Sequence, residues 1–205
     1  MSIAQVDSPG VTDEASPQAA PGGRQRFRRT VEALIRAACP SHGISLDLGC
    51  GVGHYHAAYA NRVLGLEPSV AVHQVPDGIR GTMERLPFQP SCADFITCFQ
   101  TLYYVPDLAG ALAELTRVAR PNARVLISVS KPRSIARVEQ GAQHLQRHSA
   151  RGWLQQFRTH GMRAHRLFPN PTTGPTLLRW AASRALALAS PYMWFQLEIR
   201  KGEVA

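Results

Sequence analysis

The feature of this chain best suited to chemistry is a turn with three glycines at every second position. It reads LDLGCGVG over residues 46–53, and its glycines are Gly49, Gly51 and Gly53. Glycine has no Cβ, so such a turn can take backbone angles that other residues avoid and can bring a ligand against bare amide groups. The turn is therefore predicted to bind a polar or anionic ligand. The alternative is a tight turn with a purely structural role.

The residues around these glycines argue against two common nucleotide-binding motifs and against a metal site. A dinucleotide fingerprint, G-x-G-x-x-G, counted from Gly49 requires glycine at position 54, which is His54. The run G-x-x-x-x-G-K-[ST] of a phosphate-binding P-loop is absent from the sequence. His54 and His56 make poor metal ligands, because residues two apart on a helix point to nearly opposite sides. No metal is predicted.

Alternating strand and helix patterns surround the glycine turn. Strands are predicted over residues 44–48, 62–66, 79–82, 94–100, 124–130, 162–168 and 194–199, and helices over residues 24–39, 53–60, 108–119, 149–160 and 176–189. Strands that alternate with helices of about ten residues are typical of right-handed crossover units. The predicted fold is α/β, with a doubly wound, mostly parallel seven-stranded sheet and helices on both faces.

The chain is predicted to form one domain behind a flexible tail. Its 205 residues, 44% of them hydrophobic and 18% charged, are typical of one globular domain. Residues 1–23 are rich in small and polar residues, which favours a tail and leaves residues 24–205 for the domain. Within the domain, residues 169–191 could cover a substrate pocket or simply pack on the sheet. The absence of a signal sequence or of an unbroken apolar span predicts a cytoplasmic protein.

Several motifs in register along the chain resemble the class I S-adenosylmethionine-dependent methyltransferases of the small-molecule type. They are the glycine turn, GLEP at residues 65–68, GTMERLPF at 81–88, ADF at 93–95, LYYVPD at 102–107 and ELTRVARPNARVLISV at 114–129. The resemblance covers about residues 25–200. It implies a Rossmann-like methyltransferase fold, S-adenosylmethionine as cofactor, and transfer of its methyl group to an O, N or C atom of a small metabolite.

The same resemblance implies roles for residues near the first two strands. The glycine turn, which includes Cys50, would hold the methionine portion of the cofactor, and Asp47 would support the turn and the cofactor's amino group. Glu67, followed by Pro68, would accept hydrogen bonds from both ribose hydroxyls, because a carboxylate offers two acceptor oxygens to a diol.

Two departures from the family pattern leave an alternative open. Thr82 and Met83 stand where the family usually has Asp-Ala beside the adenine, although the Thr82 hydroxyl or the Met83 amide could substitute. Asn122, with Ala123 after it, stands where Gly-Gly is common. Gln100 would face the region where cofactor meets substrate. The departures are the support for an alternative reading as a non-catalytic, S-adenosylmethionine-binding regulatory partner of another protein.

Three residues are candidates for handling the acceptor's proton. Tyr104 follows the fourth strand, where related enzymes often have a polar or aromatic residue, and His144 and His148 follow the fifth. A tyrosine or histidine can assist loss of a proton from an attacking oxygen or nitrogen. For each histidine the alternative is a solvated position on a helix.

A strong positive charge indicates anionic partners. Lys and Arg number 23 against 14 Asp and Glu, and between Arg117 and Arg184 the only acid is Glu139. Such a stretch could attract an anionic metabolite or an acidic carrier protein, or it could be a solvated surface spread over several faces. RNA methylation remains an alternative, although no appended RNA-binding module is recognisable and a nucleic-acid partner is not favoured. The oligomeric state cannot be read from the sequence.

Overall fold

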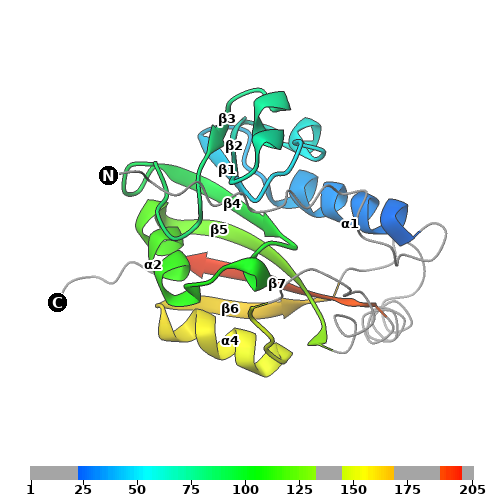
Figure 1. Cartoon of the computed structure of the whole chain (residues 1–205), viewed down its shortest axis with the longest axis vertical. Helices are drawn as coiled ribbons and strands as arrows, with labels where there is room; N and C mark the ends of the chain where they lie inside the picture. Colours follow the sequence, from blue (N-terminus) through cyan, green and yellow to red (C-terminus); the bar gives the residue numbers. More distant parts are fainter. Residues whose placement is uncertain (1–22, 133–144, 169–189, 200–205) are drawn as a thin grey trace, which may run out of the picture.

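A seven-stranded sheet forms the centre of the molecule (Figure 1). The computed structural model describes residues 23–132, 145–168 and 190–199. The strands are β1 (Ile44–Leu48), β2 (Arg62–Glu67), β3 (Gly78–Arg80), β4 (Ala93–Phe99), β5 (Ala119–Ser130), β6 (Met162–Leu167) and β7 (Tyr192–Ile199). Their order across the sheet is β3-β2-β1-β4-β5-β7-β6.

The first five strands run parallel, and the last two add an antiparallel edge. β1 pairs in parallel with both β2 and β4, and β4 pairs in parallel with β5. β7 lies antiparallel between β5 and β6. The predicted mostly parallel α/β sheet of seven strands is confirmed. Because β1 and β4 are neighbours, their carboxyl ends and the loops that follow meet at one edge, which is where α/β sheets bind ligands.

Helices cover both faces of this sheet (Figure 1). α1 (Gly23–Ala38) buries Val31 and Ile35 in a cluster with Phe95, Phe99 and Trp194. These two helical residues stand four apart, so they share one face of the helix. α2 (Leu108–Val118) and α4 (Ala150–Thr159) pack on the opposite face, where α4 buries Trp153 and Phe157. The full burial of two large aromatic rings makes α4 a firm part of the core.

The segment after the glycine turn differs from its prediction. A helix was predicted over residues 53–60, but the chain forms turns and the short 3-10 helix η2 (His56–Ala58). The connection must return along the sheet to the start of β2. An α-helix rises only about 1.5 Å per residue, less than a strand or a 3-10 helix, so a short connection covers that distance better in a more extended form. Tyr59 packs against Phe95 and its hydroxyl forms a hydrogen bond with Thr97, and these contacts fix the segment on the sheet.

The other predicted elements agree with the structure to within a few residues where it describes them. β5 begins at Ala119 rather than Arg124, because residues before the main ladder already pair with Ala93 across a bulge. η3 (Val70–Gln74) precedes β3, and η4 (Leu102–Tyr104) follows β4. The predicted tail over residues 1–23, apart from Gly23, and the predicted helix over residues 176–189 lie outside the described residues. In the described part of the chain, no helix has the length and apolarity needed to cross a membrane.

Candidate functional site

The glycine turn lies at the carboxyl end of β1 and is tied to β2 by backbone hydrogen bonds. The amides of Gly49 and Cys50 both donate to the Leu66 carbonyl, at 2.7 and 3.1 Å. Gly49, Gly51 and Gly53 all have positive φ angles, of 78°, 55° and 74°. Side chains other than glycine rarely adopt these angles, so the three glycines are required by the backbone path of the turn.

Gly51 and Glu67 face each other at the mouth of the turn. A Cβ placed on Gly51 would meet no protein atom within 4 Å, whereas one on Gly49 would lie 2.1 Å from Oγ1 of Thr101. The open space beside Gly51 is therefore room for a ligand against bare backbone. Oε2 of Glu67 accepts from the Gly51 amide at 3.2 Å, and Oε1 accepts from the Ser69 amide at 3.1 Å. The carboxylate is thereby oriented at the edge of the open space.

Asp47 is buried beneath the turn in a polar cluster. Its Oδ1 accepts from the Thr97 hydroxyl at 2.7 Å, and Thr97 in turn accepts from the Tyr59 hydroxyl. Its Oδ2 is buried and has no hydrogen-bond partner among the described residues, and it lies 3.4 Å from Nε2 of His56. Oδ2 and Nε2 of His56 thus face each other at ion-pair distance without a hydrogen bond, and because buried polar atoms are normally satisfied, a ligand that brings a donor group fits this carboxylate oxygen.

Cys50 has no nucleophilic role in this site. Its side chain is buried, and burial together with the negative charges of Asp47 and Glu67 raises its pKa to about 12. The thiolate is the reactive form of cysteine, so the Cys50 thiol is unreactive at neutral pH. Cys50 therefore shapes the turn through its backbone and its packing against Val72 and Val75.

The two departures from the family pattern have compatible local structures. Asn122 has a φ of 64°, a conformation that asparagine tolerates better than most residues, so it can stand where glycine is common. Thr82 is exposed and forms an isolated bridge with Arg85, while the Met83 side chain is buried with its sulfur 3.7 Å from the Cys98 sulfur. Since Met83 points into the core, only its backbone is left for a ligand.

Gln100 is the centre of a hydrogen-bond network at the ends of β4 and β5. Its Oε1 accepts from Ser130 Oγ at 2.7 Å and from the Tyr103 hydroxyl at 3.0 Å, and its Nε2 donates to Ser128 Oγ at 2.9 Å. Its φ of 56° is unusual for a residue other than glycine and often marks a functional site. The sidechain amide of Gln100 is thus used mainly to hold Tyr103 and the two serines in place.

The three candidate proton-handling residues have different surroundings. Tyr104 is half-buried in η4, with its ring 4.5 Å from that of Tyr103, and burial raises its pKa. A phenol with a raised pKa stays protonated at neutral pH, so it offers a neutral hydroxyl group and not a ready base. His148 packs edge-on against Trp153 at 5.0 Å, just before the Ser149 N-cap of α4, in the positions of a hydrophobic staple. His144 lies outside the described residues.

Sequence patterns had missed six polar residues of this site. They are His56, Tyr59, Thr97, Tyr103, Ser128 and Ser130. Tyr103 and Ser128 lie inside the motifs at residues 102–107 and 114–129 but had no role assigned to them, the others belong to no motif, and each becomes part of the site through the pairing of strands or loops. A polar residue at the end of a predicted central strand, such as Ser128 or Ser130, is the only local signal that could have pointed to them.

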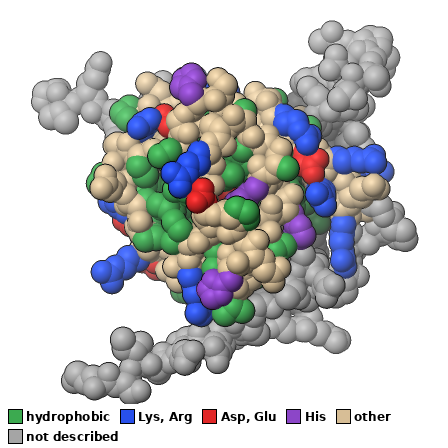
Figure 2. Space-filling view, turned by 90° about the horizontal axis from the view of Figure 1, so that it is seen from above, with side chains coloured by type: hydrophobic (Ala, Val, Ile, Leu, Met, Phe, Trp, Pro, Cys, Tyr) green, Lys and Arg blue, Asp and Glu red, His purple; other side chains and the backbone are tan. Residues whose placement is uncertain are grey.

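Positive charge is spread over one face of the molecule. Figure 2 shows Arg and Lys side chains distributed over the face seen from above, with few acidic side chains among them. No group of three or more His, Cys, Asp or Glu suited to hold a metal occurs in residues 23–132, 145–168 and 190–199.

Comparison with known proteins places the glycine turn and the strands around it in one family. Residues 46–127 match the model of the methyltransferase domain family. The chain is 34% identical over 131 residues to the demethylmenaquinone methyltransferase of Lactiplantibacillus plantarum, an alignment covering 54% of each chain. It is 28% identical over 131 residues to the malonyl-[acyl-carrier protein] O-methyltransferase of Pectobacterium atrosepticum, covering 58% of this chain and 52% of that one. The chain thus spans about half the length of these curated relatives.

The solved structures extend the likeness to most of the fold. The YcgJ protein of Bacillus subtilis superposes with a TM-score of 0.67 at 19% identity, covering 85% of this chain and 99% of that one. The seven-stranded sheet is therefore the Rossmann-like sheet of such proteins. The matched residues 46–127 contain the glycine turn and the Glu67 carboxylate at the end of β2, so this part of the chain is similar to the methyltransferase domain family, and the sheet around it has the Rossmann-like fold.

Proposed function

We propose that this protein transfers a methyl group from S-adenosylmethionine to an O, N or C atom of a small metabolite that is anionic or carrier-bound. The observation that carries the proposal is the open space beside Gly51, bounded by the Glu67 carboxylate. A sulfonium nucleoside has a ribose diol, which a carboxylate can accept, and an amino-acid end, which bare amides and a buried carboxylate can bind. The unused Oδ2 of Asp47 supports the same assignment.

Each residue of the site has a role in this proposal. The turn at Gly49, Gly51 and Gly53, with Cys50 in it, holds the methionine end, and Asp47 supports the turn from below. Glu67, before Pro68, accepts from the ribose. The backbone at Thr82 and Met83 lies by the adenine, and Gln100 positions the hydroxyls on the acceptor side.

The chemistry requires little covalent machinery from the protein. When bound, S-adenosylmethionine supplies a methyl group on a positively charged sulfur. The protein's task is to align the acceptor atom with that methyl group and to exclude water. The network of Gln100 with Tyr103 and Ser130 offers a fixed array of hydroxyls for that alignment. The Tyr104 hydroxyl accepts a hydrogen bond from the acceptor and so orients its attacking atom, while His144 and His148 remain candidates for taking up the acceptor's proton.

Calorimetry with S-adenosylmethionine and its demethylated product, S-adenosylhomocysteine, tests the cofactor. We expect stoichiometric binding of both by the folded chain. If neither compound gives a heat of binding at ligand concentrations well above the dissociation constants expected for a cofactor, the proposal is contradicted. Release of S-adenosylhomocysteine in the presence of a candidate acceptor, beyond mere thermal stabilisation by the cofactor, separates an enzyme from a non-catalytic binding partner.

Replacing Tyr104 by phenylalanine is expected to lower turnover about tenfold to a hundredfold, because the hydroxyl that orients the reacting acceptor is lost. The affinity for S-adenosylmethionine should not change, since the ring and its packing on Tyr103 are kept. Both quantities can be measured on one preparation, by product release and by calorimetry. Full turnover in Y104F, and in single replacements of His144 and His148, would remove all three residues from the mechanism.

A further inference from the structure

The helix α4 and the strand β6 after it form a basic unit without acids. Residues 149–168 contain four arginines and no Asp or Glu. Elsewhere, arginines often pair with acids: Arg117 with Glu114 at 2.6 Å and Arg120 with Asp94 at 2.7 Å. On α4, neither Arg151 nor Arg158 has an ion-pair partner among the described residues. Within the described part of the chain, no acid therefore compensates the positive charge of the helix.

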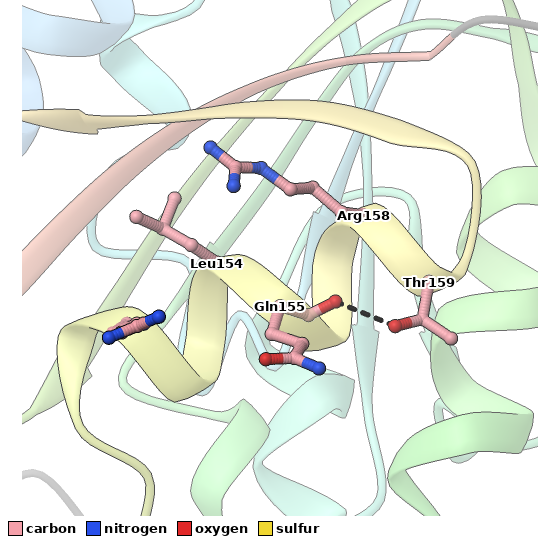
Figure 3. Close-up of a pocket in the computed structure, with 5 residues that line it drawn as sticks. Leu154, Gln155, Arg158 and Thr159 are labelled. Carbon is pink, nitrogen blue, oxygen red and sulfur yellow. Dashed lines mark hydrogen bonds between the residues drawn. The ribbon is translucent and has the colours of Figure 1, made fainter.

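The same helix has a hollow with an apolar side chain between these two arginines. The hollow, of about 430 Å³, is lined by Arg151, Leu154, Gln155, Arg158 and Thr159 (Figure 3). Leu154 and Arg158 extend on the same side of α4, while Thr159 donates to the Gln155 carbonyl at 2.8 Å. Arg151 and Arg158 are seven residues apart, about 10 Å along the helix. Two cations around an apolar side chain are complementary in charge and polarity to a partner helix whose acidic residues surround an apolar patch.

The approach to this hollow is connected to the acceptor side of the site. The segment before α4 is bonded to η4, because the amides of Leu145 and Gln146 donate to the Tyr103 carbonyl at 2.8 and 3.1 Å. Gln146 also donates through Nε2 to the Val105 carbonyl at 3.0 Å. Leu145 is 47% exposed, unusually high for a large apolar side chain here. The amino-terminal end of α4, where Arg151 stands, is thus connected through a short stretch of chain to the loop that carries Tyr104.

We propose that α4 is a docking surface for a small acidic carrier protein, which Arg151 and Arg158 hold around Leu154 and which delivers the acceptor past η4 on a flexible arm. The inference rests on the proposed function for the reaction itself. It adds the surface that recognises the carrier. Charge complementarity and the hydrogen bonds between η4 and the segment before α4 favour a protein carrier over a free metabolite, which would need no surface outside the site.

The test uses the full chain and a purified holo acyl carrier protein, with binding measured by fluorescence anisotropy. The wild-type chain should bind with an affinity that falls as salt rises. The double variant R151E/R158E should bind about tenfold more weakly or worse, because two attractions become repulsions. The double variant R26E/R29E is the matched control, since these α1 arginines are exposed and the change in net charge is the same. It should lose less than about threefold through long-range charge alone.

The variant R151Q/R158Q should fall between wild type and R151E/R158E, and all variants should keep the wild-type affinity for S-adenosylmethionine, which shows that they fold. Equal losses in the α1 and α4 variants, or no carrier binding by the wild type at low salt, would overturn the docking surface. Tighter binding of single-stranded RNA than of the carrier, lost in R151E/R158E, would overturn it in favour of RNA. If calorimetry shows no S-adenosylmethionine binding, the proposed function fails. If the cofactor binds and the carrier does not, only the docking surface fails.

Discussion

Replacing Gly51 by alanine is expected to weaken S-adenosylmethionine binding about thirtyfold or more. The added methyl group would meet no protein atom within 4 Å, so it enters the space assigned to the ligand. Alanine is also disfavoured at the positive φ of 55° at this position. The substitution therefore destabilises the turn conformation that binds the cofactor by on the order of 1–3 kcal/mol. A loss of about 2 kcal/mol corresponds to about a thirtyfold change in the dissociation constant. Calorimetry with the cofactor measures it directly.

Gly161 provides the matched control for this change. It also has a positive φ, of 75°, and an added Cβ there would also meet nothing within 4 Å. It lies between α4 and β6, away from the glycine turn. G161A should lower the melting temperature by an amount similar to G51A, because the backbone penalty is the same, and it should leave cofactor binding unchanged. Equal affinities in G51A and wild type would show that the space beside Gly51 is not the cofactor site.

Replacing Glu67 by glutamine is expected to weaken cofactor binding about tenfold to a hundredfold. Hydrogen bonds to a charged group contribute about 1.5–3 kcal/mol, and the amide keeps only one acceptor oxygen for the diol. That oxygen is also needed by the Gly51 and Ser69 amides, which the two carboxylate oxygens now serve. The measurement is again calorimetry with S-adenosylmethionine.

A second ligand separates a ribose contact from a general weakening of the loop. Wild type should bind S-adenosylhomocysteine more tightly than its 2′-deoxy analogue, and E67Q should lose most of that difference, as in a double-mutant cycle. Asp77→Asn is the control, since Asp77 pairs with Arg62 at the opposite end of β2. It should leave both affinities unchanged. An E67Q variant that weakens both ligands equally would make Glu67 a structural support of the turn and not a ribose ligand.

The fold and the first half of the site could be predicted because their signals are local. The change from apolar run to glycine turn, and the acid that ends the next apolar run, are sequential features that any α/β sheet brings to one edge. Asp47 and Cys50 are both nearly inaccessible to solvent, as expected for residues at the end of a central strand. The helix predicted over residues 53–60 failed because its apolar pattern is local, whereas the length available for the return to β2 depends on the sheet.

The polar residues around Asp47 and Gln100 could not be predicted in the same way. Thr97 reaches Asp47 because β1 and β4 are neighbours in the sheet, where Asp47 is paired with Thr97 although they are 50 positions apart in the chain. Ser128 and Ser130 reach Gln100 across the β4–β5 pair. Periodicity predicts that a residue faces the core. It carries no information on which strand lies next to it.

Local chemistry in the chain was thus enough to assign an α/β sheet and to predict a glycine turn at residues 49–53 with an acid at the end of the next strand, because glycine conformations and strand periodicity act within a few residues. Only the three-dimensional packing decided that one oxygen of Asp47 lacks a hydrogen bond, that Gln100 is held by two serines and a tyrosine, and that Arg151 and Arg158 line one hollow with Leu154. These features depend on contacts between residues far apart in sequence. Such contacts arise when the whole chain buries its apolar surface.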